Sequence, residues 1–281
     1  MSTVGLVVSH DPGAATDLAR ELAPWLGDQG HDVALVAEDA AVVGLEPLGR
    51  DAASFASGLD LAVCLGGDGT MLRTVALVHG DDVPVLGVNV GTLGYLTEVE
   101  ASAAQAALLR FVAGDYEVED RMMVQASIEG VGAPINGLNE VTVEKTPKSH
   151  TVRLSVYLHD EFFTTYVADG IIIATPTGST AYSFSARGPI VTPTHRLLVV
   201  NAVAPHMLFD RVLVLSPDDH VRMVVEGSRP AVVSVDGRQH AVLGEGDTVT
   251  CTAASTSARL VRLGDRTFHG ILKSKFGLND R

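Results

Sequence analysis

A glycine-rich segment with a single aspartate has the residue types that phosphate chemistry needs. Residues 66–70 read Gly-Gly-Asp-Gly-Thr and follow the apolar run at 61–65. Glycines at a strand-to-helix turn let the backbone approach a ligand closely, and the first N–H groups of the helix point at that ligand. A carboxylate at this place repels phosphate unless a cation lies between them or the carboxylate faces a hydroxyl that loses its proton. The segment therefore predicts a kinase that acts on an alcohol, with Asp68 as general base and a phosphate loop of Gly66, Gly67, Gly69 and Thr70.

A purely structural interpretation of this segment stays open, in which it is a tight turn and Asp68 is an ordinary helix N-cap. Neither common glycine motif fits the segment. Leu72 stands three positions after Gly69, where the dinucleotide-binding motif has its last glycine, and the P-loop lysine is missing because the first lysine of the chain is Lys145.

A second segment, residues 169–190, combines an apolar run with hydroxyl side chains. Residues 175–185 read Thr-Pro-Thr-Gly-Ser-Thr-Ala-Tyr-Ser-Phe-Ser. Neutral hydroxyl donors and small side chains suit the sugar and base of a nucleotide, and Tyr182 is a candidate stacking surface. A hydroxyl-rich turn between two strands is the alternative.

The first half of the chain alternates strand and helix signals. Apolar runs at 4–8, 33–36, 61–65 and 83–88 predict strands, while Asp11-Pro12, residues 70–78 and a capping box of Ser102 and Gln105 predict helices. We therefore expect an α/β domain with a parallel sheet over residues 1–115.

After residue 115 the apolar periodicity changes to two, as at 154–158, and Asp236-Gly237 is a turn dipeptide. A β-rich domain over residues 116–258 follows. The apolar pattern at 259–276 predicts a packed C-terminal segment.

Charge and composition exclude several classes of protein. The chain has 34 acidic and 20 basic residues, a net charge of −14. Residues 1–115 contain 16 acidic residues and 4 arginines (Arg20, Arg50, Arg73, Arg110), a net charge of −12. A nucleic-acid binder needs a basic surface, which this composition does not supply. The two cysteines cannot build a disulfide framework, and no apolar stretch approaches ~20 residues. We expect a soluble cytoplasmic protein without a protein-held metal site.

Together these motifs resemble the NAD kinase family. The resemblance is carried, in the family's order, by residues 66–70, 89–96 (Asn-Val-Gly-Thr-Leu-Gly-Tyr-Leu), Asn139-Glu140 and 169–190, and it extends over residues 1–276. It implies phosphorylation of NAD at the 2′-hydroxyl of the adenosine ribose, with ATP or polyphosphate as donor. It also implies a β-sandwich second domain, a C-terminal segment at 259–281 that packs back on the first domain, and a homodimer or homotetramer.

The resemblance further implies the residues of the NAD site. Val167 stands where the family often has a basic residue, and His150 is the nearest equivalent of an arginine or lysine that often follows the Asn-Glu pair. The implied NAD-binding residues are Asp68, Gly69, Arg73, Asn139, Glu140, His150, Asp169, Thr180, Ala181, Tyr182, Ser183 and Ser185.

Because these segments contain few Lys or Arg side chains, we predict a strict requirement for Mg²⁺, which would bridge the donor phosphates. Two other functions remain open. A lipid kinase can share the glycine-aspartate turn, although the chain lacks a basic amphipathic face for a membrane. A non-catalytic NAD-sensing module would keep the pocket without turnover. The choice between ATP and polyphosphate, and the acceptance of NADH, are not decided by the sequence.

Overall fold

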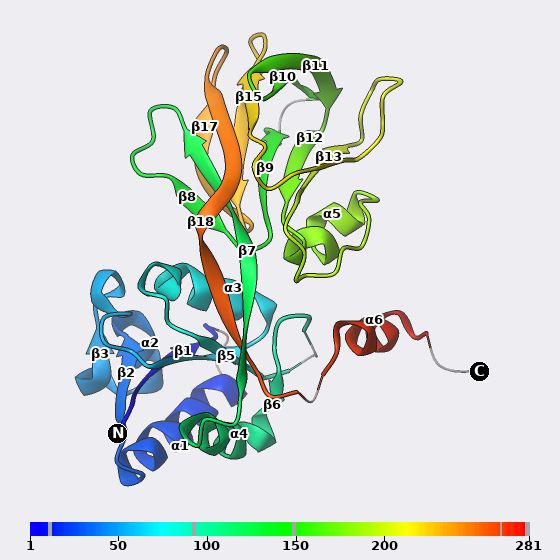
Figure 1. Cartoon of the computed structure of the whole chain (residues 1–281). Helices are drawn as coiled ribbons and strands as arrows, with labels where there is room; N and C mark the ends of the chain where they lie inside the picture. The colour runs from blue at the N-terminus through cyan, green and yellow to red at the C-terminus, as the bar shows by residue number, and fades with distance from the viewer. Residues whose placement is uncertain (11–12, 92–93, 148–149, 265, 279–281) are drawn as a thin grey trace. The chain divides into compact units, whose positions relative to one another are not determined.

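The computed structural model describes residues 1–10, 13–91, 94–147, 150–264 and 266–278 (Figure 1). The chain divides into two compact units. Unit 1 comprises residues 1–120 and 258–281, and unit 2 comprises residues 121–257. The chain passes from unit 1 to unit 2 within β7 (Glu117–Ile128) and returns within β18 (Thr248–Arg262).

The sheet of unit 1 is parallel, which confirms the expectation from the sequence. Its strands run in the order β3-β2-β1-β4-β5, and β6 and the end of β18 also pair with β5. All six residues of β4 are buried, which explains why this strand is apolar without polar alternation. The strands are β1 (Thr3–Val8), β2 (Asp32–Val36), β3 (Gly49–Arg50), β4 (Leu61–Gly66), β5 (Val85–Asn89) and β6 (Val99–Glu100).

The first and the fourth helix each bury an apolar face against this sheet. Leu22 and Leu26 of the first helix and Leu108 and Phe111 of the fourth lie in one core cluster with the strand residues. The helices are α1 (Ala14–Asp28), α2 (Ala37–Val43), α3 (Asp68–Val78), α4 (Ala104–Val112) and α6 (Phe268–Phe276), with 3₁₀ turns η1 (Glu46–Leu48), η2 (Ala52–Ser54), η3 (His79–Asp81) and η4 (Ala101–Ala103).

The predicted ends of the helices are less accurate than the predicted helices themselves. The capping box of Ser102 and Gln105 is wrong, because α4 begins only after the η4 turn and its N-cap, Ala103, makes no side-chain hydrogen bond. The start predicted at Asp11-Pro12 lies outside the described residues.

Unit 2 is a sandwich of antiparallel strands, as the resemblance implies. One sheet has the order β14-β13-β12-β9-β16-β17, and the other contains β11-β10-β15-β18 with β7 and β8. Side chains of both sheets, such as Val143 and Ile171 from the first and Leu154 and Met223 from the second, form one core. The bounds are β8 (Ile135–Gly137), β9 (Glu140–Lys145), β10 (Val152–Leu158), β11 (Glu161–Ala168), β12 (Gly170–Ala174), β13 (Leu198–Val203), β14 (Leu213–Leu215), β15 (Val221–Val225), β16 (Ala231–Val235) and β17 (Arg238–Leu243).

The hydroxyl-rich segment is partly helical. It forms the 3₁₀ turn η5 (Thr177–Thr180) and the short helix α5 (Tyr182–Ser185) directly after β12.

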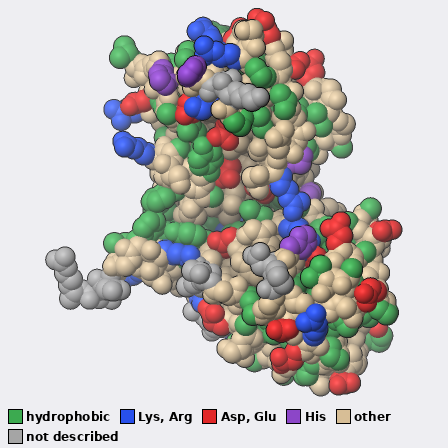
Figure 2. Space-filling model, turned by 180° about the vertical axis from the view of Figure 1, so that it is seen from behind, with side chains coloured by type: hydrophobic (Ala, Val, Ile, Leu, Met, Phe, Trp, Pro, Cys, Tyr) green, Lys and Arg blue, Asp and Glu red, His purple; other side chains and the backbone are tan. Residues whose placement is uncertain are grey.

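The surface of unit 1 is acidic. In Figure 2 the Asp and Glu side chains, in red, are spread over the visible face of this unit with few Lys or Arg among them. Within the described residues, no helix is both long and apolar enough to cross a membrane.

Candidate active site

The Gly66–Thr70 turn connects β4 to α3 and places Asp68 in the first turn of the helix. Gly67 is the N-cap, and Asp68 is the first helical residue. The purely structural interpretation, in which Asp68 is the N-cap of the helix, is therefore wrong on this point. A carboxylate in the first turn is stabilised by the helix dipole, while the helix directs unpaired backbone N–H groups out of the same end. The turn thus combines a carboxylate with the donors of a phosphate site.

Two backbone amides from a distant segment hold the Asp68 carboxylate. The N–H of Tyr95 donates to Oδ2 and the N–H of Leu96 donates to Oδ1, each at 2.9 Å. A side chain at Gly94 would collide with this carboxylate, so glycine is required there for the close approach. Burial, together with the nearby Asp68 charge, raises the pKa of Tyr95. The predicted motif at 89–96 therefore positions Asp68, although its residues 92 and 93 lie outside the described residues.

Arg73, one turn further along α3, is fixed by a buried carboxylate. Its NH1 and NH2 atoms lie 2.9 Å and 2.5 Å from Oδ1 and Oδ2 of Asp39, whose side chain is fully buried. NH2 also donates to the Val8 carbonyl at 2.7 Å, and the Val8 N–H donates to Asp39 Oδ2 at 2.8 Å. His10 Nε2 lies 2.9 Å from Arg73 NH1. Arg73 is thus anchored at the carboxyl end of β1, with 14% of its side chain exposed.

In unit 2, the turn aspartate of the β16–β17 hairpin organises the Asn139-Glu140 pair. Asp236 accepts hydrogen bonds from the backbone N–H groups of Leu138, Asn139 and Glu140 at 2.7, 2.8 and 3.1 Å. Asp236 itself has a φ of 48°, as the first residue of an Asp-Gly hairpin turn requires. The sequence identified Asp236-Gly237 as a turn but not this contact, because about a hundred residues separate the partners.

Glu140 is a buried carboxyl whose pKa rises to about 8. Burial is the main cause, the Asp236 charge adds to it, and a hydrogen bond from the Tyr182 backbone opposes it. Within the described residues, Glu140 Oε2 is a buried atom without a hydrogen-bond partner. Glu140 is therefore mostly protonated at neutral pH, and it can donate as well as accept a hydrogen bond.

The hydroxyl-rich segment packs directly on the Asn139-Glu140 pair. The N–H of Thr175 donates to the Asn139 carbonyl at 2.9 Å, and Thr175 Oγ1 donates to the Leu138 carbonyl at 2.6 Å. A side chain at Gly178 would collide with the Asn139 carbonyl. The structure therefore brings together the two unit 2 segments that the sequence singled out.

Many hydroxyls of this segment are bonded within the protein. Ser179 Oγ donates to the Pro176 carbonyl at 2.7 Å, and the buried Ser183 lies next to Asn201, which donates to the Ser183 carbonyl at 3.2 Å. Thr180, Ala181 and Tyr182 are half-buried, and Ser185 is exposed. The segment is a rigid scaffold that exposes only some of its polar groups.

Two charged side chains of β9, Glu144 and Lys145, interact with residues 169 and 182 of this segment. Lys145 Nζ lies 2.8 Å from Asp169 Oδ1, and Tyr182 Oη donates to Glu144 Oε1 at 2.8 Å. Burial first, and then this hydrogen bond, raises the pKa of Tyr182 to about 12. The predicted basic residue, His150, is exposed, and its carbonyl accepts from Lys145 Nζ at 3.4 Å.

Three charged residues beside the predicted site were missed by the sequence reasoning. Lys145 pairs with Asp169, Asp39 holds Arg73, and Asp236 holds the Asn139-Glu140 segment. Lys145 could have been suggested by the strand pattern, because it is the last residue of β9, the strand that begins at Glu140 of the Asn-Glu pair. Nothing local marks Asp39.

Comparisons with known proteins identify the family of both parts of the chain. The family described as ATP-NAD kinase N-terminal domain matches residues 4–116, and the ATP-NAD kinase C-terminal domain matches residues 138–263. The chain is 44% identical to an NAD kinase of Heliobacterium modesticaldum, covering 98% of both chains. It is 36% identical to NAD kinase 1 of Streptomyces coelicolor, covering 99% of this chain and 86% of that protein.

Two solved structures share the fold. Yeast NADH kinase complexed with NADH superposes with a TM-score of 0.88 at 23% identity, covering 100% of this chain and 89% of that chain. An NAD kinase from Archaeoglobus fulgidus in complex with ATP gives a TM-score of 0.75 at 22% identity, covering 99% of both chains.

Proposed function

Since the chain belongs to the NAD kinase family, it is a phosphotransferase that acts on an alcohol group, and we propose that it phosphorylates NAD at the 2′-hydroxyl of the adenosine ribose to form NADP. ATP is the proposed donor, with polyphosphate as the alternative. The complexes of the two structural relatives, one with NADH and one with ATP, support both ligands.

The clamped carboxylate of Asp68 carries the proposal. Its two oxygens each accept one backbone N–H, which fixes the orientation of the carboxylate and leaves further lone pairs for a substrate hydroxyl. In the proposed mechanism Asp68 orients the ribose hydroxyl and accepts its proton. A carboxylate is a weak base, so the proton leaves late, when the phosphoryl group is already being transferred in a loose transition state. Positioning therefore contributes most of the catalysis.

Unit 2 supplies the proposed NAD-binding groups. Asn139 and Glu140 are held in place by Asp236, and the protonated Glu140 suits a ligand hydroxyl because it can donate or accept. Asp169 is the remaining carboxylate, and its pairing with Lys145 lowers the local negative charge. The proposed contacts are completed by Gly69, Arg73, His150, Thr180, Ala181, Tyr182, Ser183 and Ser185, with Gly66, Gly67 and Thr70 at the phosphates.

Mg²⁺ is the proposed metal ion, bound with the donor phosphates. The donor chemistry of the site fits it, because Asp68 offers the hard oxygen ligands that Mg²⁺ prefers. The described residues contain no group of three or more His, Cys, Asp or Glu side chains that could hold a metal ion. When bound, the ion would neutralise negative charge on the donor phosphates.

Replacement of Asp68 by asparagine tests the role of the general base. We expect Asp68→Asn to lower kcat by about 10²- to 10⁴-fold, the usual cost of losing a general base, while NAD still binds. NADP formation is measured with an NADP-specific coupled enzyme, and NAD binding by calorimetry. The melting temperature is measured as a control for stability, because the NH2 group of an asparagine would face one of the two backbone N–H groups that donate to the Asp68 carboxylate. Turnover near that of the unchanged protein would refute the assignment.

Removal of metal tests the proposed ion and separates an enzyme from an NAD-sensing module. With ATP or polyphosphate as donor, we expect NADP formation to stop after chelation with EDTA and to return when Mg²⁺ is added in excess. Activity that survives chelation would contradict the metal requirement, and NAD binding without turnover on either donor would favour the sensing module. The homodimer or homotetramer and the cytoplasmic location stay predictions.

A further inference from the structure

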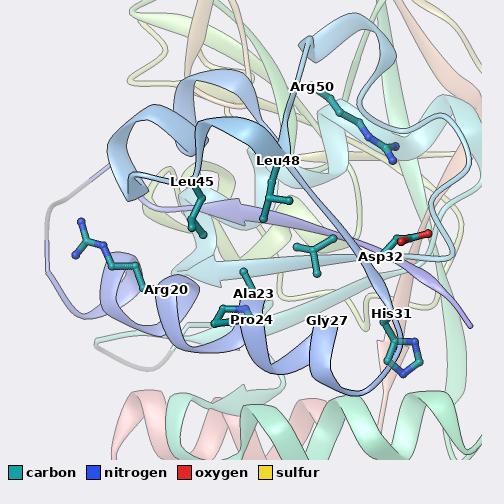
Figure 3. A pocket seen from close by; sticks show the side chains of 10 residues that line it. Arg20, Ala23, Pro24, Gly27, His31, Asp32, Leu45, Leu48 and Arg50 are labelled. Atoms are coloured by element: carbon teal, nitrogen blue, oxygen red, sulfur yellow. The ribbon is translucent and has the colours of Figure 1, made fainter.

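Unit 1 contains a pocket that lies outside the segments assigned to catalysis. Its volume is about 540 Å³, within the range of ~300–1,000 Å³ typical of small-molecule sites. The pocket lies between α1, η1 and the strands β2 and β3 (Figure 3). It is lined by Arg20, Ala23, Pro24, Gly27, His31, Asp32, Val33, Leu45, Leu48 and Arg50.

The walls of the pocket are apolar and remain partly open to solvent. Val33, Leu45 and Leu48 pack against the core of unit 1 but are only half-buried. Opposite them, α1 presents Pro24 and Gly27, which are too small to fill the space. A ligand with an apolar ring or a short apolar chain would cover these walls and shield them from water. Burial of apolar surface favours binding by about 25 cal/mol per Å².

Half of the arginines among residues 1–115 line this one pocket. Of the four arginines in this acidic stretch, Arg73 is paired with Asp39 and Arg110 with Asp115, whereas Arg20 and Arg50 lie at the two ends of the pocket. Within residues 1–115, two of the four arginines thus lie beside exposed apolar walls.

The two arginines differ in how far their charge is neutralised. Arg20 is paired with Asp17 at 3.1 Å and donates from Nε to the Val43 carbonyl. Arg50 donates one hydrogen bond, at 3.0 Å, to the neutral carbonyl of Ser57, and among the described residues it takes part in no ion pair. A guanidinium has five N–H donors, so Arg50 has both charge and donors for an anion. Asp32 lies at the same end of the pocket as Arg50, and its negative charge would oppose the binding of an anion.

We propose that this pocket binds a small amphipathic anion. The apolar body of the ligand lies against Val33, Leu45 and Leu48, and its carboxylate, sulfonate or phosphate group is bound by Arg50. This site is separate from the nucleotide site, because its lining includes none of the residues of the Gly66–Thr70 turn or of unit 2.

The test uses 8-anilinonaphthalene-1-sulfonate as probe, since it combines aromatic rings with one anionic group. Fluorescence titration of the full chain should give one saturable site that neither ATP nor NAD displaces. Arg50→Gln should raise the dissociation constant about tenfold or more, as expected for the loss of a charge-assisted hydrogen bond. Asp32→Asn should lower the constant, because it removes the opposing charge. Arg259→Gln, at an exposed pair with Asp82, is the control and should change nothing.

An uncharged probe separates recognition of the anion from general apolar binding. N-phenyl-1-naphthylamine has the same ring system without the sulfonate, so its affinity should not respond to Arg50→Gln. Circular dichroism checks that the variants are folded. If Arg50→Gln does not fold, Asp32→Asn still tests the proposal independently. Equal constants for Arg50→Gln and the unchanged protein, no response to Asp32→Asn, or displacement of the probe by ATP or NAD would overturn the proposal. Because binding is measured directly, the outcome does not depend on catalysis.

Discussion

The buried Glu140 should make the stability of unit 2 depend on pH, and Glu140→Gln should remove that dependence. The pKa of this carboxyl rises from 4.5 to about 8, mainly because burial disfavours its charged form. Between these values the folded protein keeps a proton that the unfolded chain has released. Stability is therefore greatest at acidic pH and falls as the pH rises, by about 1.4 kcal/mol per pH unit.

Across this window of about 3.5 pH units the effect adds up to a loss of about 5 kcal/mol. Glutamine mimics the protonated carboxyl in size and in its ability to donate a hydrogen bond. We therefore expect Glu140→Gln to match the unchanged protein near pH 5 within about 1 kcal/mol, and to exceed it by several kcal/mol near pH 9.

Guanidinium unfolding followed by circular dichroism between pH 5 and 9 measures this difference. The single tryptophan, Trp25, belongs to unit 1, so its fluorescence distinguishes unfolding of that unit from unfolding of unit 2. Glu161→Gln replaces an exposed glutamate on β11 and serves as the matched control. If the free energies of unfolding of the unchanged protein and Glu140→Gln run parallel across this pH range, the argument from burial is wrong.

Two further substitutions test the positioning of groups in unit 1. Gly94→Ala should lower kcat by about 10²-fold, because the added methyl group displaces the Asp68 carboxylate from its two amides, and Gly80→Ala, which meets open space, should leave the NADP assay unchanged. Equal rates for both variants would contradict this. Asp39→Asn should destabilise unit 1 by about 3–5 kcal/mol in Trp25-monitored unfolding, because Arg73 remains as an unpaired buried charge. Adding Arg73→Met to Asp39→Asn should restore part of that stability, and simple additivity of the two changes would argue against the pairing.

The sequence predicted those parts of the site that depend on local patterns. The apolar run before Gly66 and the helical pattern after Thr70 were enough to place Asp68 at a strand-to-helix turn, since β4 is buried on both faces. The Asp236-Gly237 turn followed from the same kind of local rule. Both predictions succeeded because turn and strand propensities act over a few residues.

The contacts that orient the site could not be predicted in this way. Asp39 holds Arg73 across 34 residues, and Tyr95 holds Asp68 across 27, so neither partner stands near the other in the sequence. The capping box failed for a related reason. Its residue types fit, but burial of Leu108 and Phe111 fixed the register of α4, while Leu109 and Val112 stay about half exposed (50% and 46%). Tertiary packing decided both the helix start and its buried face.

The discontinuity of unit 1 has a consequence for its folding during synthesis. Val261 and Leu263 belong to the core of this unit, and Leu260 pairs with Val85 of β5. These residues leave the ribosome only after residues 121–257 have been made, which takes on the order of ten seconds at ~5–20 residues per second. During this delay the nascent first 120 residues have an unpaired strand edge and an incomplete core. The delay creates a period in which chaperones would be expected to bind this segment, and it implies that unit 1 cannot reach full stability before unit 2 has been synthesised.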